Sequence, residues 1–358
     1  MAQIRAAVCN EFGKPLEIET VELAAPTGRS IEVTLEACAI CHSDISYIDG
    51  IWGGDLPAVF GHEAAGVISD VGDGVTGLNK GDRVIVTLIR SCGTCASCGG
   101  GKPTACERPN GPAPLTRADG TEITQAMFCG AFAEKVVVDQ SQVAVIPDGI
   151  ASDTASLLSC GVITGVGAVV NAAGLRAGQD ALIIGAGGVG LNAIQGARIA
   201  GARRIVAVDM TEEKLEDARA FGATDVILAT DPKPWRKLRE LTGRGADAVF
   251  VSVGAIPAYE TAPKYLAHGG KVIMVGMPAV GAEAKYIPVN MAAVGQGMIG
   301  SKMGDTVLQR DIPWLCDLYL QGRLKLDELI SNRWSLDQIN DAIADTKSGA
   351  ARRNVIVF

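Results

Sequence analysis

Four cysteines that fall close together are the first residues whose types and spacing could do chemistry. Cys92, Cys95 and Cys98 are each separated by two residues, and Cys106 follows after seven more. Four thiolates so spaced can close around one tetrahedral zinc ion, and a site with four protein ligands has no position left for substrate. The alternative is a loop of free thiols. The spacing predicts a structural zinc site.

A second pattern is the glycine-rich stretch Gly185-Ala186-Gly187-Gly188-Val189-Gly190, which follows an apolar run and opens a helical pattern. Glycines there allow a tight turn, a close approach to a pyrophosphate and close packing of helix on strand, while the helix N-terminus faces the negative charge. In this context the pattern predicts a dinucleotide-binding site.

Asp209 ends the next apolar run, about 20 residues further along the chain, where dinucleotide-binding proteins place a carboxylate. Such a carboxylate accepts hydrogen bonds from the adenosine ribose and repels a 2′-phosphate, so NAD is favoured over NADP. The alternative role is to cap the helix that begins near Thr211, and one residue can do both.

A catalytic zinc would need three ligands from distant parts of the chain and one open position. The chain has three histidines, His42, His62 and His268, and His62 lies in Gly61-His62-Glu63 before an apolar β-like run. A lone histidine is more often a hydrogen-bonded core residue than a ligand. From these residues alone both interpretations stay open.

The elements that position these groups differ between the two halves of the chain. Short β-type runs at residues 31–35, 64–69, 83–88, 133–138 and 142–146 predict an irregular β-rich domain. Residues 91–130 are rich in Gly, Pro, Cys and Thr without periodicity. We expect a long surface loop there, and a loop of this length needs either an internal cross-link such as a metal site or a functional role.

From about residue 162 strands alternate with amphipathic helices, which predicts a parallel sheet built from βαβ units. The expected strands are residues 181–184, 204–208, 225–228, 248–253 and 271–275, with helices at 188–200 and 212–221. A helix at 309–321 and a β-like tail at 354–358 follow. The tail suits a return to the first domain, which makes the parallel-sheet domain an insertion.

Composition narrows the class of partner. Hydrophobic residues make up 48%, charged residues 20%, and the net charge is -8, so no basic surface favours nucleic acid or an anionic membrane. We expect a small-molecule substrate. Without a signal-peptide pattern or a run of about 18 apolar residues, a cytoplasmic location is expected, and the ten cysteines indicate metal binding more than disulfides.

Five motifs, in order, resemble those of the zinc-containing medium-chain alcohol dehydrogenases over essentially the whole chain. They are Cys41-His42-Ser43-Asp44, Gly61-His62-Glu63-Ala64-Ala65-Gly66, the four-cysteine loop, Cys160-Gly161-Val162-Ile163-Thr164-Gly165 and the glycine stretch. The resemblance implies an α/β protein in which a GroES-like β-barrel catalytic domain (residues 1–161 and 303–358) carries an inserted Rossmann domain, a doubly wound parallel sheet (residues 162–302). It also implies a homodimer or homotetramer.

The resemblance implies two zinc ions per subunit. Cys41, His62 and Cys160 would bind the catalytic zinc, with Glu63 just behind it and able to exchange with the bound water. Asp44 would orient His62 and fix its tautomer. The cysteines at 92, 95, 98 and 106 would hold the structural zinc.

Further roles follow from the same resemblance. Ser43 would take the alcohol proton and pass it to the cofactor ribose, although a buried, backbone-bonded serine is the alternative. Ser46 stands where liver-type members have the histidine that ends the relay, so the route beyond Ser43 is open. Trp52 and Leu88 would line the alcohol pocket. The alternative for Trp52 is an aromatic residue of the hydrophobic core. The expected cofactor-binding residues are His42, Thr164, Gly185, Gly187, Gly188, Val189, Gly190, Asp209, Lys214, Val253, Val275, Met277 and Arg353.

The expected activity is NAD-linked hydride transfer between a primary alcohol and its aldehyde. One alternative is a thiol-adduct (S-hydroxymethyl) formaldehyde dehydrogenase of the same superfamily. Another is a non-catalytic zinc and NAD binding redox sensor, against which the intact set Cys41, Ser43, His62 and Cys160 argues.

Overall fold

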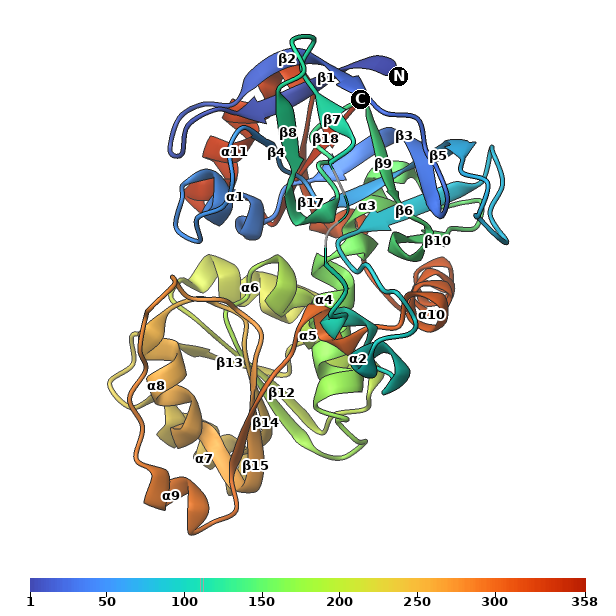
Figure 1. The fold of residues 1–358 in the computed structure, drawn as a ribbon. Helices are drawn as coiled ribbons and strands as arrows, with labels where there is room; N and C mark the ends of the chain where they lie inside the picture. Colours follow the sequence, from blue (N-terminus) through green and yellow to red (C-terminus); the bar gives the residue numbers. More distant parts are fainter. Residues whose placement is uncertain (110, 112) are drawn as a thin grey trace. The chain divides into compact units, whose positions relative to one another are not determined.

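The computed structural model describes residues 1–109, 111 and 113–358 of the chain (Figure 1). These residues form two compact units. Unit 1 consists of Met1–Cys160 together with Val307–Phe358, and unit 2 is the continuous segment Gly161–Thr306.

Unit 1 contains a small closed barrel of the strands β1, β2, β7, β8 and β4, in that order. Their bounds are β1 (Ala2–Cys9), β2 (Glu17–Leu23), β4 (Ala58–Val59), β7 (Leu115–Thr116) and β8 (Glu122–Gln125). β7 and β8 lie inside residues 91–130, for which an irregular surface excursion was expected. That expectation is wrong for these two strands, because segments of two and four residues are too short to show a period in the sequence.

The larger sheet of unit 1 has the order β10-β6-β5-β3-β18-β17, with β9 also paired to β3. The strands are β3 (Ser30–Ala39), β5 (Glu63–Val71), β6 (Arg83–Thr87), β9 (Lys135–Asp139), β10 (Val143–Val145), β17 (Ile330–Trp334) and β18 (Arg353–Val357). β18 pairs antiparallel with β3, so the end of the chain returns to the first strands. Fully buried valine and isoleucine side chains of β3, β5, β6 and β9 form the core beside this sheet.

Five α-helices accompany the sheets among the described residues of unit 1. They are α1 (His42–Ile48), α2 (Ala96–Gly99), α3 (Ser152–Ser156), α10 (Leu308–Leu320) and α11 (Ile339–Ser348). α1 is short and begins directly at the motif that contains the predicted zinc ligand Cys41, which is its N-cap. The helix thereby fixes where this cysteine can lie.

Unit 2 is a parallel sheet in the order β13-β12-β11-β14-β15-β16. Its strands are β11 (Asp180–Ile184), β12 (Arg204–Asp209), β13 (Asp225–Leu228), β14 (Ala246–Val251), β15 (Leu266–Met274) and β16 (Gly297–Gly300). The helices are α4 (Gly161–Gly167), α5 (Gly188–Ile199), α6 (Glu212–Phe221), α7 (Pro234–Thr242), α8 (Ile256–Tyr265) and α9 (Pro288–Ala292). Figure 1 shows α4 and α5 on one side of the sheet and α7 and α8 on the other.

Coverage of both faces explains why β11 is buried along its whole length and reads as an unbroken apolar run apart from its first residue. The expected strands and helices of this unit are confirmed to within a few residues, except that β15 begins at Leu266, five residues before the expected start. β16 was not expected, because two of its four residues are glycine.

Among the described residues no single helix is long and apolar enough to cross a membrane. One bent pair, Ser152–Ser159 with Gly161–Ala172, passes the same test of length and composition when its two halves are taken together.

Candidate active site

Four residues that are far apart in the sequence meet in the interior of unit 1. The potential ligand atoms of Cys41, His62, Glu63 and Cys160 all lie within 4.8 Å of one another, and all four residues are buried. Cys41 is the N-cap of α1, His62 and Glu63 stand at the start of β5, and Cys160 ends the short helical turn Leu157–Ser159. Two thiolates and an imidazole at such distances are a typical zinc ligand set.

Asp44 organises this cluster from behind. Its carboxylate accepts hydrogen bonds from the backbone N–H of Cys41 at 3.0 Å and of Gly61 at 2.9 Å, and it lies 2.9 Å from Nδ1 of His62. Asp44 is itself fully buried. One carboxylate therefore fixes both the chain at Cys41 and the orientation of the His62 ring.

The atoms opposite Asp44 are unsatisfied. Nε2 of His62 and both carboxylate oxygens of Glu63 are buried and have no hydrogen-bond partner among the described residues. Such atoms are rare in folded proteins, because each one costs free energy on leaving water. A zinc ion held by His62 Nε2 and the two thiolates would give the unsatisfied imidazole nitrogen a partner. The residues present therefore fit the metal.

The titratable groups of the cluster hold protons that a metal ion would have to displace. Burial lowers the pKa of His62, but the Asp44 carboxylate outweighs this and holds it well above its ordinary value. A hydrogen bond from Cys160, with help from His62, holds the pKa of Cys41 well below that of a free thiol. Burial raises the pKa of Glu63 to about 8, although Nη1 of Arg353 lies 3.3 Å from its Oε1. Zinc binding would displace the protons from the thiols and the imidazole.

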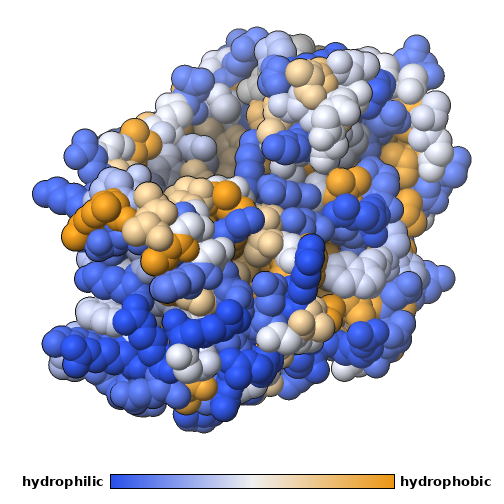
Figure 2. Space-filling view, turned by 90° about the horizontal axis from the view of Figure 1, so that it is seen from below, coloured by the Kyte–Doolittle hydropathy of each residue, from blue (hydrophilic) through white to orange (hydrophobic). Residues whose placement is uncertain are grey.

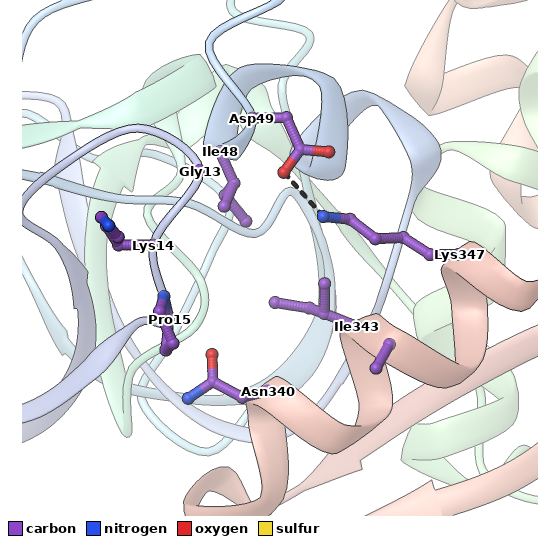
Figure 3. Close-up of a pocket in the computed structure, with 9 residues that line it drawn as sticks. Gly13, Lys14, Pro15, Ile48, Asp49, Asn340, Ile343 and Lys347 are labelled. Carbon is purple, nitrogen blue, oxygen red and sulfur yellow. Dashed lines mark hydrogen bonds and ion pairs between the residues drawn. The ribbon is translucent and has the colours of Figure 1, made fainter.

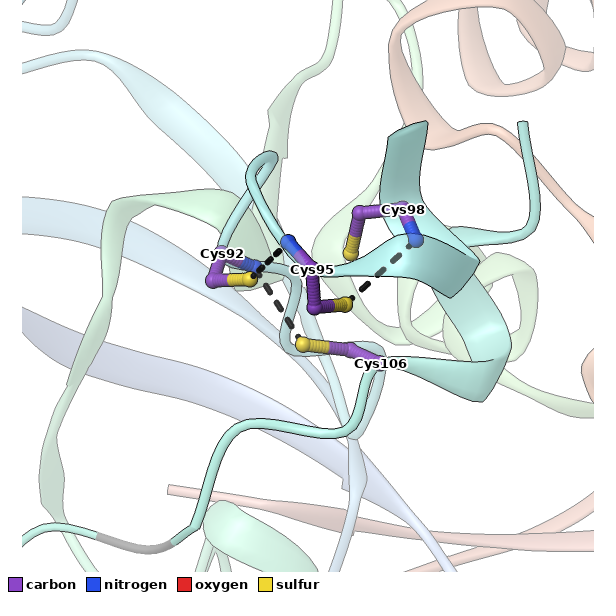
Figure 4. Close-up of side chains that lie close together, drawn as sticks. All are labelled: Cys92, Cys95, Cys98 and Cys106. Carbon is purple, nitrogen blue, oxygen red and sulfur yellow. Dashed lines mark hydrogen bonds between the residues drawn. The ribbon is translucent and has the colours of Figure 1, made fainter. Parts of the chain in front are cut away.

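The second predicted site lies in the cysteine loop around α2, where Figure 4 shows four sulfur atoms that point toward one another. The Sγ atoms of Cys92, Cys95, Cys98 and Cys106 lie within 4.8 Å of one another. Backbone N–H groups donate to these sulfurs: Cys92 N to Cys106 Sγ at 3.3 Å, Cys95 N to Cys92 Sγ at 3.3 Å and Cys98 N to Cys95 Sγ at 3.4 Å. This arrangement favours a metal site over a loop of free thiols.

Hydrogen bonding makes part of this loop ready to bind metal. The N–H of Thr94, followed by that of Cys95, lowers the pKa of Cys92 to about 5. Burial raises the pKa of Cys98 to about 11, and its bonds to neighbouring cysteines add to the effect. Four thiolates in so small a volume repel one another, and a bound divalent cation would offset this electrostatic repulsion.

The glycine stretch of unit 2 has the geometry that a pyrophosphate needs. Gly185 has φ +96°, and a Cβ at Gly190 would lie 1.8 Å from the carbonyl oxygen of Gly185. A Cβ at Gly187 would meet no atom within 4 Å. The first and last glycines are thus required by the fold, whereas the surface above Gly187 stays open at the N-terminus of α5.

Asp209 lies beside this turn. Its carboxylate accepts hydrogen bonds from the backbone N–H of Ala186 and of Met210, each at 2.7 Å. The N-cap of α6 is Thr211, whose hydroxyl accepts from Lys214 N at 3.4 Å. The capping role considered for Asp209 is therefore wrong, because Thr211 performs it.

The other expected cofactor residues of unit 2 follow strand ends. Val253 lies just after β14, and Val275 and Met277 lie just after β15. Ligands of open parallel sheets bind at this carboxyl edge. Lys214 is in the first turn of α6, and Thr164 is buried in α4 with Oγ1 3.7 Å from Sδ of Met303.

The remaining expected residues belong to unit 1. His42 is exposed at the start of α1, and Ser43 and Ser46 are half-buried in the same helix. Arg353 is 5% exposed and opens β18, so the alternative of a solvated charge is wrong for it. Half-buried Trp52 contacts Tyr47 edge-on with ring centroids 5.1 Å apart, and half-buried Leu88 follows β6.

Comparison with known proteins identifies the chain. Residues 28–148 match the alcohol dehydrogenase GroES-like domain, and residues 188–321 match the zinc-binding dehydrogenase domain. The chain is 37% identical over 365 residues to the putative alcohol dehydrogenase D of Mycobacterium tuberculosis, covering 98% of this chain and 99% of that protein. It belongs to the zinc-dependent medium-chain dehydrogenase family.

Other members of this family are nearly as similar. The NDMA-dependent alcohol dehydrogenase of Amycolatopsis methanolica is 35% identical (99% and 98% covered), and the S-(hydroxymethyl)glutathione dehydrogenase of Paracoccus denitrificans 34% (99% and 99%). Among solved structures, an alcohol dehydrogenase zinc-binding domain protein from Burkholderia ambifaria has TM-score 0.95 at 33% identity (100% and 99%). The benzyl alcohol dehydrogenase of Acinetobacter calcoaceticus has TM-score 0.94 at 29% identity (100% and 100%).

Family membership confirms the predicted α/β fold with its GroES-like domain and Rossmann-like parallel sheet. It also makes the chain an oxidoreductase of the zinc-dependent alcohol dehydrogenase type, which uses zinc and a nucleotide cofactor with a small-molecule alcohol. The alternative of a non-catalytic redox sensor is set aside on this ground.

A surface hollow of about 200 Å³ in unit 1 contains none of the predicted site residues (Figure 3). Two of its polar side chains already have partners. Asn340 exchanges two hydrogen bonds with the backbone of Leu16, at 2.8 and 2.9 Å, and Lys347 pairs with Asp49 at 2.6 Å. These two polar side chains are therefore engaged within the protein itself.

Exposed apolar residues are concentrated in one segment of unit 2. Met277, Val280, Tyr286, Ile287 and Val289 are each more than half exposed. Figure 2 shows a largely hydrophilic face that apolar patches interrupt. An exposed apolar stretch is typical of an interaction surface, and the expected homo-oligomer remains a prediction.

Proposed function

We propose that this alcohol dehydrogenase transfers hydride between a primary alcohol or its aldehyde and NAD. Residues 1–161 and 303–358 would form the catalytic domain and residues 162–302 the NAD domain. The observation that carries the proposal is the buried cluster of Cys41, His62 and Cys160, whose potential ligand atoms lie within 4.8 Å of one another while His62 Nε2 has no hydrogen bond. When bound, zinc would lower the pKa of the alcohol hydroxyl and the nicotinamide would accept the hydride.

The chain's own residues orient the reaction. Cys41 and Cys160 supply two thiolates, and Asp44 locks the His62 ring through Nδ1 so that Nε2 is presented to the metal. Ser43, half-buried two residues after Cys41 in α1, is the group proposed to take the alcohol proton. Ser46 in the same helix offers only a hydroxyl, so the route of the proton beyond Ser43 stays open. Glu63 stands behind the ligands, and the four cysteines of the α2 loop would hold a second, structural zinc.

NAD is favoured over NADP by the position of Asp209. Its carboxylate lies at the glycine turn, bonded to Ala186 N, where the adenosine ribose of a bound dinucleotide belongs. A 2′-phosphate would meet this negative charge. The proposed cofactor contacts are those of the sequence analysis: the glycine turn, Asp209, Lys214, Val253, Val275, Met277 and Thr164 from unit 2, and His42 and Arg353 from unit 1.

Replacing Asp209 with asparagine or glycine should therefore narrow the preference for NAD. Loss of a charged hydrogen-bond acceptor should reduce kcat/KM for NAD by roughly tenfold or more, while kcat/KM for NADP rises because repulsion is removed. Asp225→Asn on the adjacent strand is the matched control and should leave the ratio unchanged. Equal efficiency with both cofactors in the unmutated protein would show that Asp209 does not face the ribose.

The substrate is proposed to be a primary alcohol of small to moderate size, aliphatic or aromatic. Trp52 and Leu88, both half-buried, are the proposed pocket residues. A second candidate is an S-hydroxymethyl thiol, since the Paracoccus denitrificans relative is named as a dehydrogenase of such an adduct and matches over the whole chain.

A panel of alcohols assayed for NADH production, with and without a low-molecular-weight thiol, tests both candidates. Turnover of primary alcohols without thiol supports the first. Turnover of formaldehyde only when thiol is present would replace it by the second. No NADH from any alcohol or adduct, in protein that contains zinc, would refute the proposed function altogether.

A further inference from the structure

Unsatisfied polar atoms are concentrated around the predicted catalytic zinc. Of five buried side-chain atoms without a hydrogen bond in the described chain, four belong to His62, Glu63 and Thr87. His62 Nε2 is explained by zinc binding. Zinc binding does not explain the two oxygens of Glu63 or the hydroxyl of Thr87. Thr87 belongs to none of the family motifs quoted above.

Strand register places Thr87 beside Glu63. Glu63 at the start of β5 is directly opposite Thr87 at the end of β6, and on its other side it is opposite Ala39 of β3. Directly paired residues of antiparallel strands carry their side chains on the same face of the sheet, with Cβ atoms about 4.5–5.5 Å apart. The Thr87 hydroxyl and the Glu63 carboxylate therefore project from the same face.

The pairing of β18 with β3 explains in the same way why Arg353 reaches the Glu63 carboxylate. Val355 of β18 is opposite Ala39, and Arg353 is two residues earlier, so it shares the face. The methyl group of Ala39 leaves the space between β18 and β5 open, and Nη1 of Arg353 lies 3.3 Å from Oε1 of Glu63. Glu63 thus has a cation on one side and a hydroxyl on the other.

Both Thr87 and Glu63 are fully buried, so neither can be satisfied by bulk water. The Glu63 carboxylate has the ion pair with Arg353 but no hydrogen bond, and the Thr87 hydroxyl has no acceptor, so each leaves part of its desolvation penalty uncompensated. A bond from the hydroxyl to the carboxylate removes both penalties at once. It requires only rotation of the Glu63 side chain, because its carboxylate and the Thr87 hydroxyl can come within hydrogen-bond distance when the two Cβ atoms are about 4.5–5.5 Å apart.

We propose that Thr87 is a positioning residue for Glu63: its hydroxyl donates a hydrogen bond that, with Arg353, holds the carboxylate away from the open coordination position of the catalytic zinc. The inference rests on the proposed function, because it needs a metal at Cys41, His62 and Cys160. Without the Thr87 donor the carboxylate is free to approach the metal and compete with substrate for the open position.

Cobalt in place of the catalytic zinc tests this without relying on turnover, since its visible absorption changes with ligand set and coordination number. Thr87→Val has nearly the same shape but no hydroxyl, and Thr87→Ser keeps the hydroxyl. We expect the Thr87→Val spectrum to shift, and the Thr87→Ser spectrum to match that of the unmutated protein. With zinc bound, kcat/KM for alcohol should fall roughly tenfold in Thr87→Val, as expected for one lost hydrogen bond to a charged group.

A double variant separates positioning from packing. In a Glu63→Gln background, adding Thr87→Val should cause no further spectral shift, because the competing carboxylate is gone. A shift of the same size in both backgrounds, or no shift in Thr87→Val alone, overturns the proposal. Unfolding midpoints of all variants establish that they are folded.

The wild-type spectrum tells the two proposals apart. If cobalt-loaded unmutated protein gives the same spectrum as cobalt-loaded Cys160→Ala, the absorption comes only from the four-cysteine loop, the catalytic metal site is wrong and both proposals fall. If these two spectra differ and the unmutated protein oxidises alcohols while Thr87→Val is unaltered, only the role of Thr87 is refuted.

Discussion

Replacing Cys160 with alanine is expected to abolish alcohol oxidation while the chain stays folded. Cys160 is one of two thiols in a buried ligand set of three residues, and its loss leaves too few ligands to hold an ion with an open position. Zinc content should fall from about two to about one per chain. Because a Lewis acid contributes several kcal/mol to such a reaction, kcat should fall roughly 10³-fold or more.

Cys316 offers a matched control for this experiment. It is 1% exposed in α10, and it belongs to neither cysteine cluster found in the described residues. Cys316→Ala removes a buried thiol of the same size, so it should cost some stability but keep both zinc ions and activity. Metal analysis with circular dichroism makes the comparison. If Cys160→Ala kept two zinc ions, Cys160 would not be a ligand.

The second large effect is expected in the cysteine loop, where Cys98→Ala should release the other zinc and destabilise the loop. Little else holds this segment: α2 spans only Ala96–Gly99 and has no buried residue. Metal binding by four thiolates therefore supplies its folding free energy directly. We expect a lower unfolding midpoint and rapid protease cleavage near residues 91–109.

Two neighbours make this test specific. Cys106→Ala should behave like Cys98→Ala, because the two sulfurs belong to one ligand set. Ser97→Ala, which removes a hydroxyl bonded to Glu107 at 2.5 Å in the same loop, should keep its zinc and its protease resistance. Full stability with two zinc ions in Cys98→Ala would refute the structural role of the loop.

Unit 2 was predictable from sequence because each of its signals is local. An apolar strand, a glycine turn and an amphipathic helix follow one another within about 20 residues, and the parallel order of the sheet follows from repeated βαβ units. In unit 1, β7 and β8 could not be predicted, because their two and four residues acquire strand geometry only by pairing with β2 and β4.

The candidate site also combines features with a local sequence signal and features that depend on the folded structure. The four-cysteine loop could be recognised from the spacing of its cysteines. His62, in contrast, is a lone histidine next to an apolar run, and in the sequence it cannot be told from an ordinary core histidine. The resemblance to a known family, carried by ordered motifs, indicated that Cys41, His62 and Cys160 belong together. Thr87 had no such signal, since its importance depends on its register opposite Glu63 and on a buried hydroxyl, neither of which a sequence displays.

The return of β18 to β3 also dictates an order of assembly. Unit 2 is one continuous segment and can fold as soon as it has been synthesised, whereas unit 1 must join pieces on either side of it. The contact of Arg353 with the carbonyl of Ile40 closes a separation of 313 residues, and such distant contacts form late. Cys41, His62 and Cys160 are thus all made before Arg353 emerges from the ribosome. During translation Glu63 lacks the counter-charge of Arg353, which arrives only when the last strand docks.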